Sequence, residues 1–381
     1  MIIKKIFIFC LAVLVTLGLA STTLAKKKPN PPGLASEATL GKLLYFDRNL
    51  SANQDQACAS CHDPNAGWAD PLNVRLPVQF QFSAGSFTDL FGGRNAPPAG
   101  YAMFSPPFFF DAAAGLYTGG QFWDGRAATL KDQAKGPFLN PVEMAMADET
   151  AVIAALKDPA NPNAVDYQFY FLQLYGIDLS AIDTTPVVPP AVQVPAVITA
   201  YDKLAQAIGE FEKTEIFAPF SSKWDEVQAG NATFTPLEAQ GELLFNTKAQ
   251  CNLCHPGPLF TDFTYDNLGI PPLNGDYTNP DLGLGAGDNS LVAAIDLPLQ
   301  EGKFKVSSLR NIAMTPPYGH NGFFATLKEI VHFYNTAGDG TWPAPEVNVN
   351  VNRGELGNLL LTPQEEDAVV AFLKTLTDRT P

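Results

Sequence analysis

The chain has 381 residues, enough for two ordinary domains, and its apolar fraction of 46% excludes a disordered polar protein. Its 24 basic and 39 acidic residues give a formal net charge of -15. This charge argues against a nucleic-acid-binding protein, which needs a basic face. The 4 histidines and 5 cysteines are few enough to be assigned one by one.

The first 25 residues have the pattern of a signal peptide. Lys4 and Lys5 precede an apolar stretch, residues 6–20, and a small-residue cleavage site ends at Ala25. The apolar stretch is short for a membrane span, so we expect cleavage rather than an uncleaved anchor. No later stretch is apolar enough to span a bilayer. The sequence therefore predicts export to the periplasm, without stable membrane insertion after cleavage, and the loss of Cys10.

Two C-x-x-C-H motifs contain all the cysteines that remain. Their chemistry-bearing residues are Cys58, Cys61 and His62, and Cys251, Cys254 and His255. At this spacing two thiols can form thioethers with the vinyl groups of one porphyrin, and the adjacent imidazole becomes the proximal iron ligand. The wide separation of the pairs argues against a zinc ribbon, and their duplication with His argues against a thioredoxin-like redox pair. The sequence predicts two covalently bound c-type haems.

Helices are expected before both haem motifs and at the C-terminal end of the chain. Residues 41–46 and 241–245 have the pattern of amphipathic helix ends. Thr235 is a predicted N-cap, with Pro236 at the first helical position and Glu238 completing a capping box. The last helix has the same start signal at Thr362-Pro363, and residues 196–213 carry a helical apolar stripe.

Strand-like alternation is scarce, so the sequence predicts a mainly α fold with long irregular loops. We expect two cytochrome c-like haem domains. Residues 30–220 would form an N-terminal, peroxide-reactive c-type haem domain, and residues 221–381 a C-terminal, electron-transfer one.

The axial ligands distinguish the two haems. An electron-transfer haem normally has two strong axial ligands, whereas a catalytic haem keeps one site open. The first domain has no further His, and its possible distal ligands are Met103, Met144 and Met146. The first haem is therefore the better candidate for a reactive site. For the second haem, spacing alone does not choose between Met314, His320, His332 and Tyr334.

Over nearly the whole mature length, the chain resembles the bacterial di-haem cytochrome c peroxidase and MauG family. The landmarks are Leu40–Asp47, Arg94–Pro97, Gln121–Ala127, Asn140–Met144, Leu309–Asn311 and Pro317–His320. The resemblance implies that Glu143 is the distal carboxylate of the peroxide-reacting haem, with Gln133 and Pro137 as its pocket neighbours. A carboxylate above an open iron can take a proton from peroxide and return it to the leaving oxygen.

Further roles follow from the same resemblance. Trp123 matches the indole that lies between the haems, a natural electron relay. Asn95, Thr315 and Pro317 match calcium-contacting positions, so the resemblance implies one Ca²⁺ held by carbonyl oxygens and waters. Plain loop residues are an equally good interpretation of these three positions from the sequence alone.

The resemblance also chooses a ligand for the second haem. Tyr334 stands where ordinary members have a Met ligand and MauG-type members have Tyr. A phenolate is a hard anion that stabilises oxidised iron. His320 would then lie beside the haem without binding the iron, Met314 would be a core residue, and His332 would lie at the surface. Residues 63–93 contain no His that could cap the first iron, so we expect that iron to be open.

The sequence therefore predicts a peroxidase or oxidase of the MauG type that uses hydrogen peroxide to oxidise a protein or small electron donor. The resemblance implies a high-valent di-haem state. One alternative is a peroxide-scavenging cytochrome c peroxidase that takes electrons from a small cytochrome or cupredoxin. A non-enzymatic di-haem electron carrier is the other. MauG carries a Trp before its second haem motif, but the segment here is Thr247–Gln250, so its quinone-forming partner is not implied.

Overall fold

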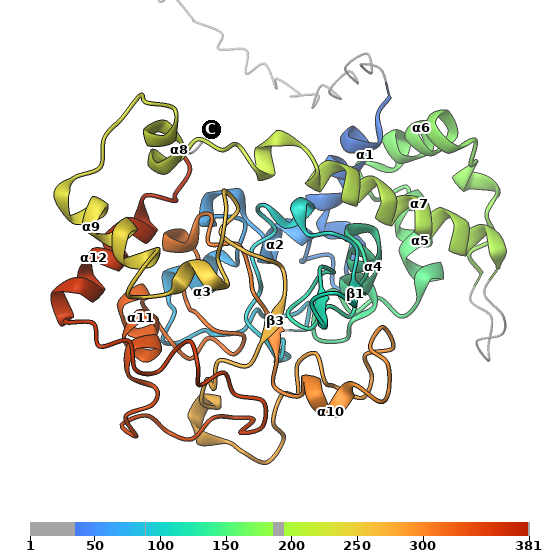
Figure 1. Cartoon of the computed structure of the whole chain (residues 1–381). Coiled ribbons are helices and arrows are strands. Elements are labelled where there is room, and N and C mark those ends of the chain that lie inside the picture. The colour runs from blue at the N-terminus through green and yellow to red at the C-terminus, as the bar shows by residue number, and fades with distance from the viewer. Residues whose placement is uncertain (1–34, 88, 186–193, 380–381) are drawn as a thin grey trace, which may run out of the picture. The chain divides into compact units, whose positions relative to one another are not determined.

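The structure is a computed structural model that describes residues 35–87, 89–185 and 194–379 (Figure 1). The predicted signal peptide, residues 1–25, lies outside the described residues. Within the described ranges, no helix combines the length and the apolar character needed to cross a membrane.

The described residues are mainly helical and contain few, short strands, which confirms the predicted fold class. The helices are α1 (Glu37–Tyr45), α2 (Cys58–Cys61), α3 (Pro71–Arg75), α4 (Leu130–Leu139), α5 (Glu149–Lys157), α6 (Ala164–Tyr175), α7 (Pro195–Glu212), α8 (Lys223–Gln228), α9 (Pro236–Phe245), α10 (Leu297–Gln300), α11 (Leu327–Thr336) and α12 (Pro363–Lys374). The strands form two antiparallel pairs, β1 (Phe109–Asp111) with β2 (Leu116–Thr118), and β3 (Tyr265–Asp266) with β4 (Phe304–Lys305).

The helix starts follow their local capping signals. Thr235 accepts a hydrogen bond from the Glu238 N–H and donates its own N–H to the Glu238 carboxylate, which is the predicted capping box of α9. Thr362 forms the same arrangement with Glu365 at the start of α12. These two predictions are confirmed. The helix predicted at 196–213 is present as α7, which ends at Glu212 with Lys213 as its C-cap.

The helix before each haem motif crosses a later helix at very short range. A Cβ atom on Gly41 of α1 would lie 1.9 Å from the carbonyl oxygen of Ala207 in α7. A Cβ atom on Gly241 of α9 would lie 1.9 Å from the carbonyl oxygen of Ala368 in α12. The same close crossing therefore occurs beside both haem motifs, and in each pair only a glycine fits at the contact.

Two apolar cores accompany these crossings. The first contains buried residues between Leu40 and Phe217, and helices α1, α5, α6 and α7 supply many of them. The second contains buried residues between Leu244 and Leu376, many of them from α9, α11 and α12. A smaller apolar cluster contains Tyr117 from one half of the chain and Tyr265 from the other. The division into two haem domains, with its boundary between residues 220 and 221, stays a prediction.

Polar contacts join the two halves of the chain. Arg94 forms ion pairs with Asp124 and Asp281, at 2.5 and 2.6 Å. The hydroxyl of Tyr101 donates to Asp378 at 2.9 Å. Segments that are distant in the sequence therefore meet between the two cores. The structure contains two large cavities, and residues of these segments line both of them.

Candidate active site

The first cavity is lined by the first haem motif. Helix α2 is a single turn that places Cys58 and Cys61 on the wall, and His62 follows at its C-terminal end. His62 Nδ1 lies 3.2 Å from the carbonyl oxygen of Trp68, which leaves Nε2 free to bind a metal. Desolvation lowers the pKa of His62 and so favours the neutral ring that a metal requires.

Glu143 lies in the same cavity, together with Gln133 and Pro137 from α4. The chain leaves α4 at Asn140, whose side-chain amide donates to Glu143 Oε1 at 2.7 Å. Desolvation raises the pKa of Glu143, while the hydrogen bond from Asn140 and the charge of Arg126 partly oppose that rise. The cavity therefore holds a positioned carboxyl group that is more basic than an ordinary glutamate.

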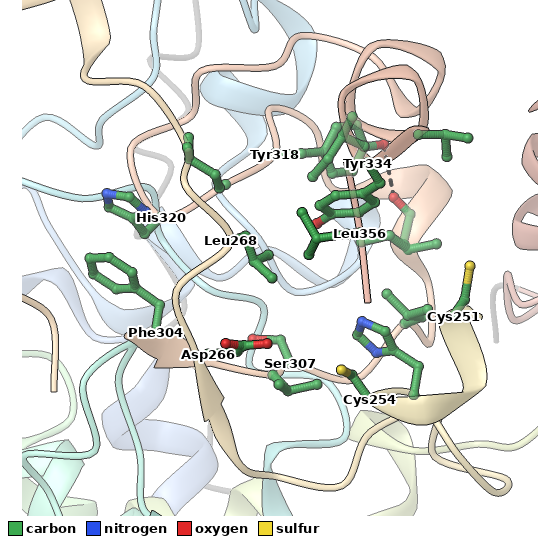
Figure 2. Close-up of a pocket in the computed structure, with 18 of the residues that line it drawn as sticks. Cys251, Cys254, Asp266, Leu268, Phe304, Ser307, Tyr318, His320, Tyr334 and Leu356 are labelled. Atoms are coloured by element: carbon green, nitrogen blue, oxygen red, sulfur yellow. Dashed lines mark hydrogen bonds between the residues drawn. The ribbon is translucent and has the colours of Figure 1, made fainter. Parts of the chain in front are cut away.

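The second cavity repeats the attachment pattern around Cys251, Cys254 and His255 (Figure 2). His255 Nδ1 lies 2.8 Å from the carbonyl oxygen of Phe260. Desolvation again lowers the pKa of the imidazole and favours the neutral ring. Both predicted proximal histidines thus have Nδ1 fixed by a backbone carbonyl.

Tyr334 projects from α11 into this second cavity, which it lines together with the cysteine pair (Figure 2). Desolvation raises the pKa of Tyr334 well above its usual value, and the charges of Cys251, Cys254 and Asp266 add to that effect. Thioether formation would remove the two cysteine charges. An iron cation in the cavity would favour the phenolate, in the way that bound metals deprotonate their ligands.

Two of the competing ligands, Met314 and His332, do not line this cavity, whereas His320 does. None of the described methionines lines the second cavity, and Met314 is half-buried beside Gly67, not fully in a core. His332 is exposed, with Nδ1 2.9 Å from Glu366. His320 is buried and lines the cavity, stacked on Phe304 at 3.6 Å between ring centroids. Figure 2 shows His320 well removed from Tyr334, and its Nε2 lies 2.9 Å from Glu346.

Trp123 lies in the wall common to both cavities. The residues that line both are Asn95, Pro98, Trp123, Lys305, Ser307 and Ser308. The indole Nε1 of Trp123 donates to the Asn95 carbonyl at 2.8 Å, and the Lys305 N–H donates to the Trp123 carbonyl at 2.8 Å. The indole is therefore held in position between the spaces beside the two haem motifs.

The residues matched to calcium positions come together at the second cavity. Asn95, Thr315 and Pro317 all line it. None of the three carries a charge, so a calcium ion there would depend on carbonyl oxygens and water. Calcium binding at this place stays a prediction.

The sequence pattern did not single out two ionisable residues at these cavities, Glu212 and Lys305. Glu212 is buried in the wall of the first cavity, its Oε2 has no hydrogen-bond partner, and desolvation raises its pKa to about 8. A signal was present, because Glu212 follows Ile208 by one helical turn on the buried face of α7. Lys305 carries no such signal, since β4 is short and lies among irregular loops.

Acidic side chains also meet beside the second cysteine pair. Ligand atoms of Cys254, Asp266 and Glu355 lie within 4.8 Å of one another, and Asn352 donates to both carboxylates, at 2.6 and 2.7 Å. All four residues line the second cavity. Because Cys254 is a predicted attachment cysteine, this cluster would belong to the haem site.

The residues present fit two c-type haems. The four described cysteines are free, so their thiols are available for thioethers. Each pair lines a separate cavity next to a histidine with an available Nε2. This donor set is the one that covalent haem attachment requires.

Comparison with known proteins agrees with this geometry. A family model described as "Di-haem cytochrome c peroxidase" matches residues 35–233. The "Methylamine utilization protein MauG" of Paracoccus denitrificans (strain Pd 1222) is 40% identical over 394 residues, covering 97% of this chain and 95% of that protein. The "Cytochrome c551 peroxidase" of Nitrosomonas europaea is 30% identical over 357 residues, covering 92% and 82%.

A solved structure gives the same result for the fold. The diheme peroxidase BthA from Burkholderia thailandensis E264 matches with a TM-score of 0.75 at 29% identity, covering 92% of this chain and 87% of that one. The fold, the paired cavities and the relatives therefore lead to one conclusion. The chain belongs to the di-haem cytochrome c peroxidase family and is a haem-dependent oxidoreductase.

Proposed function

We propose that this protein is a periplasmic di-haem oxidase of the MauG type that uses hydrogen peroxide to oxidise a protein or a small electron donor. The observation that carries the proposal is Tyr334 in the wall of the second cavity. A phenolate stabilises oxidised iron more than the thioether of a methionine does. The 40% identity to a protein named MauG supports the same assignment.

The proximal ligands of the two irons would be His62 and His255, and each cysteine pair would hold one porphyrin. Bound haem supplies the redox chemistry with peroxide, and residues of this chain handle the proton. Glu143 would accept a proton from peroxide and return it to the departing oxygen. The hydrogen bond from Asn140 to Oε1 leaves Oε2 for this exchange.

Two neighbours would restrict how peroxide enters and orients in the first cavity. Gln133 and Pro137 lie on adjacent turns of α4, and both line the cavity with Glu143. The amide of Gln133 can donate to an oxygen atom, whereas the ring of Pro137 can only exclude water. Together they define one polar and one apolar boundary around the carboxyl group.

Trp123 would carry electrons between the two haems. It lines both cavities, and its indole is fixed by the hydrogen bond to the Asn95 carbonyl. Tyr334 would hold the iron of the second haem, and its phenolate would stabilise the oxidised states of that iron. One Ca²⁺ near Asn95, Thr315 and Pro317 would keep this boundary rigid through oxygen ligands.

The net charge of the chain indicates the chemical class of its electron donor. A formal net charge of -15 attracts a basic protein or cationic donor before contact. The segment Thr247–Gln250 lacks the Trp that MauG-type members carry, so we do not assign the quinone-forming partner of MauG. The same charge favours the second candidate function, a cytochrome c peroxidase that takes electrons from a small basic cytochrome or a cupredoxin.

Turnover with a donor tests the proposal against this second candidate. The diferric protein should react with peroxide without prior reduction, because residues 63–93 offer no His to close the first iron. Its steady-state oxidation of a reduced basic cytochrome should be slow, since Tyr334 disfavours reduction of the second haem. A requirement for prior reduction, together with fast cytochrome turnover, would instead establish the cytochrome c peroxidase function.

A further inference from the structure

Lys305 is a cationic side chain in an unusual position. It belongs to β4 and lines both cavities, within the wall that also contains Trp123. Its backbone N–H donates to the Trp123 carbonyl at 2.8 Å, so the position of β4 is coupled to that of the indole. A charge placed here acts on both haem sites at once.

The ammonium group of Lys305 has neutral partners. It donates to Ser105 Oγ at 2.5 Å and to the carbonyl oxygen of Gly120. An ammonium carries three donors, and among the described residues these two oxygens are its only hydrogen-bond partners. The ammonium also lies 5.7 Å from the centroid of the Phe263 ring. One of its N–H groups therefore has no hydrogen-bond acceptor among the described residues.

The other cations of the cavity walls are already paired. Arg94 forms ion pairs with Asp124 and Asp281, and Arg126 pairs with Asp124. Among the described Lys and Arg residues that line the cavities, Lys305 alone has no carboxylate partner. Desolvation, with no compensating charge, lowers the pKa of Lys305 to about 7. An anion in the cavity would remove this penalty.

The propionate groups of a haem are anions that could meet the ammonium of Lys305, because Lys305 lines both cavities. Porphyrin vinyl groups form the thioethers, and the propionate groups occupy the other edge of the ring. Figure 2 shows Phe304, the β4 neighbour of Lys305, far across the second cavity from Cys251 and Cys254. A haem attached at those cysteines would have its propionates on the side of the ring away from them, and Lys305 is a residue of the cavity wall that could bind them.

We propose that Lys305 binds haem propionate carboxylates at the wall shared by the two cavities and sets the reduction potentials of both haems. The proposal depends on haem attachment alone and not on any reaction with peroxide. A fixed positive charge beside a haem disfavours the ferric state relative to the ferrous state, so it raises the reduction potential. Lys305 would also keep each propionate in place beside Trp123.

Potentiometric titration of the purified holoprotein tests this role. In Lys305→Met both haem midpoint potentials should become more negative, and in Lys305→Arg they should stay close to wild type. Lys42→Met removes an exposed lysine of α1 and should shift neither potential. Unchanged potentials in a Lys305→Met protein that contains both haems would overturn the proposal. A shift confined to one haem would overturn the claim that Lys305 acts on both haems.

Two further measurements keep the test decisive if Lys305→Met does not incorporate haem. Lys305→Gln keeps a donor for Ser105 and Gly120 but removes the charge, so it should give the same negative shift. A crystal structure of the wild-type holoprotein should place Lys305 Nζ within hydrogen-bond distance of a propionate oxygen. An ammonium that reaches no propionate oxygen in that structure would contradict the proposal.

Discussion

At the scale of single residues, the two cavities differ in the ionisable group that would face a bound haem. The first presents Glu143, a carboxyl group held by Asn140 and made more basic by desolvation. The second presents Tyr334, a phenol whose ionisation requires a nearby cation. The first group is suited to proton transfer with peroxide, and the second is suited to holding iron in its oxidised states.

Replacement of Glu143 tests its proton-transfer role. Glu143→Gln should retain both haems but slow the spectral change caused by peroxide by about a hundredfold or more, because an amide cannot shuttle the proton. Stopped-flow mixing with peroxide measures the rate. Glu215→Gln changes an exposed glutamate and should react like the wild type. Equal rates in Glu143→Gln and the wild type would show that a group other than Glu143 transfers the proton.

The pH dependence gives an independent test of the same group. Glu143 must be ionised to accept a proton, and desolvation raises its pKa above the ordinary value for glutamate. The rate of reaction with peroxide should therefore fall as the pH is lowered through this raised pKa. The acid limb should disappear in Glu143→Gln. An acid limb that persists unchanged in this variant would mean that a different group titrates.

Replacement of Tyr334 tests the ligand of the second haem. Tyr334→Met should raise the reduction potential of that haem, because a thioether stabilises ferrous iron more than a phenolate does. Tyr334→Phe offers no ligand and serves as the matched control, in which the second haem should lose its sixth ligand. Spectroelectrochemistry measures both potentials. If the second haem keeps its wild-type spectrum in Tyr334→Phe, then Tyr334 does not bind the iron.

At the scale of secondary-structure elements, the two close helix crossings hold the haem motifs in place. Gly41 meets α7 and Gly241 meets α12, in each case at a backbone carbonyl. The attachment cysteines follow the glycine-bearing helix in each half of the chain. Any larger side chain at either glycine would push the two helices apart. The position of each haem motif relative to its core therefore depends on these glycines.

Alanine substitution measures this dependence. Gly41→Ala or Gly241→Ala should destabilise the holoprotein by about 1–3 kcal/mol, the usual cost of overpacking a close contact. Thermal unfolding followed by circular dichroism detects the loss. Gly287→Ala is the control, because its Cβ would meet nothing within 4 Å and its φ is not positive. If Gly41→Ala had the same melting temperature as the control, α1 and α7 would have to be farther apart than the 1.9 Å approach at Gly41 indicates.

The helix starts could be predicted from the sequence, whereas the wall shared by the two cavities could not. The starts of α9 and α12 were predictable because Thr235 and Thr362 carry local capping signals. The wall shared by the two cavities was not, since Asn95 and Lys305 lie in distant, irregular parts of the chain. Periodicity carries no information about such loops, and the role of Trp123 came from family resemblance alone.

At the scale of the whole molecule, the two halves of the chain have the same arrangement of helix, cysteine pair and histidine. They differ in the side chains that line their cavities. Each half has a glycine-bearing helix, a C-x-x-C-H motif and a histidine fixed by a carbonyl group. Six residues, Trp123 among them, line both cavities. Under the proposed function, this shared wall would connect the two haem sites.

Haem content is the first whole-molecule prediction. The mature protein should contain two covalent haems and no reactive thiol, because Cys58, Cys61, Cys251 and Cys254 all lie in attachment motifs. Intact mass spectrometry, with and without an alkylating reagent, measures both quantities. A mass gain equal to a single haem, or any alkylated cysteine in the mature chain, is incompatible with the two-haem assignment.

The most direct test of the account is the spectrum of the resting diferric protein, recorded before and after one equivalent of peroxide. The resting protein should contain one high-spin haem at the open first site and one six-coordinate low-spin haem with Tyr334 as its ligand. Peroxide should then change the spectra of both haems together, because Trp123 connects them. A methionine-to-iron charge-transfer band in the resting protein, or a second haem that peroxide leaves unchanged, would contradict the account.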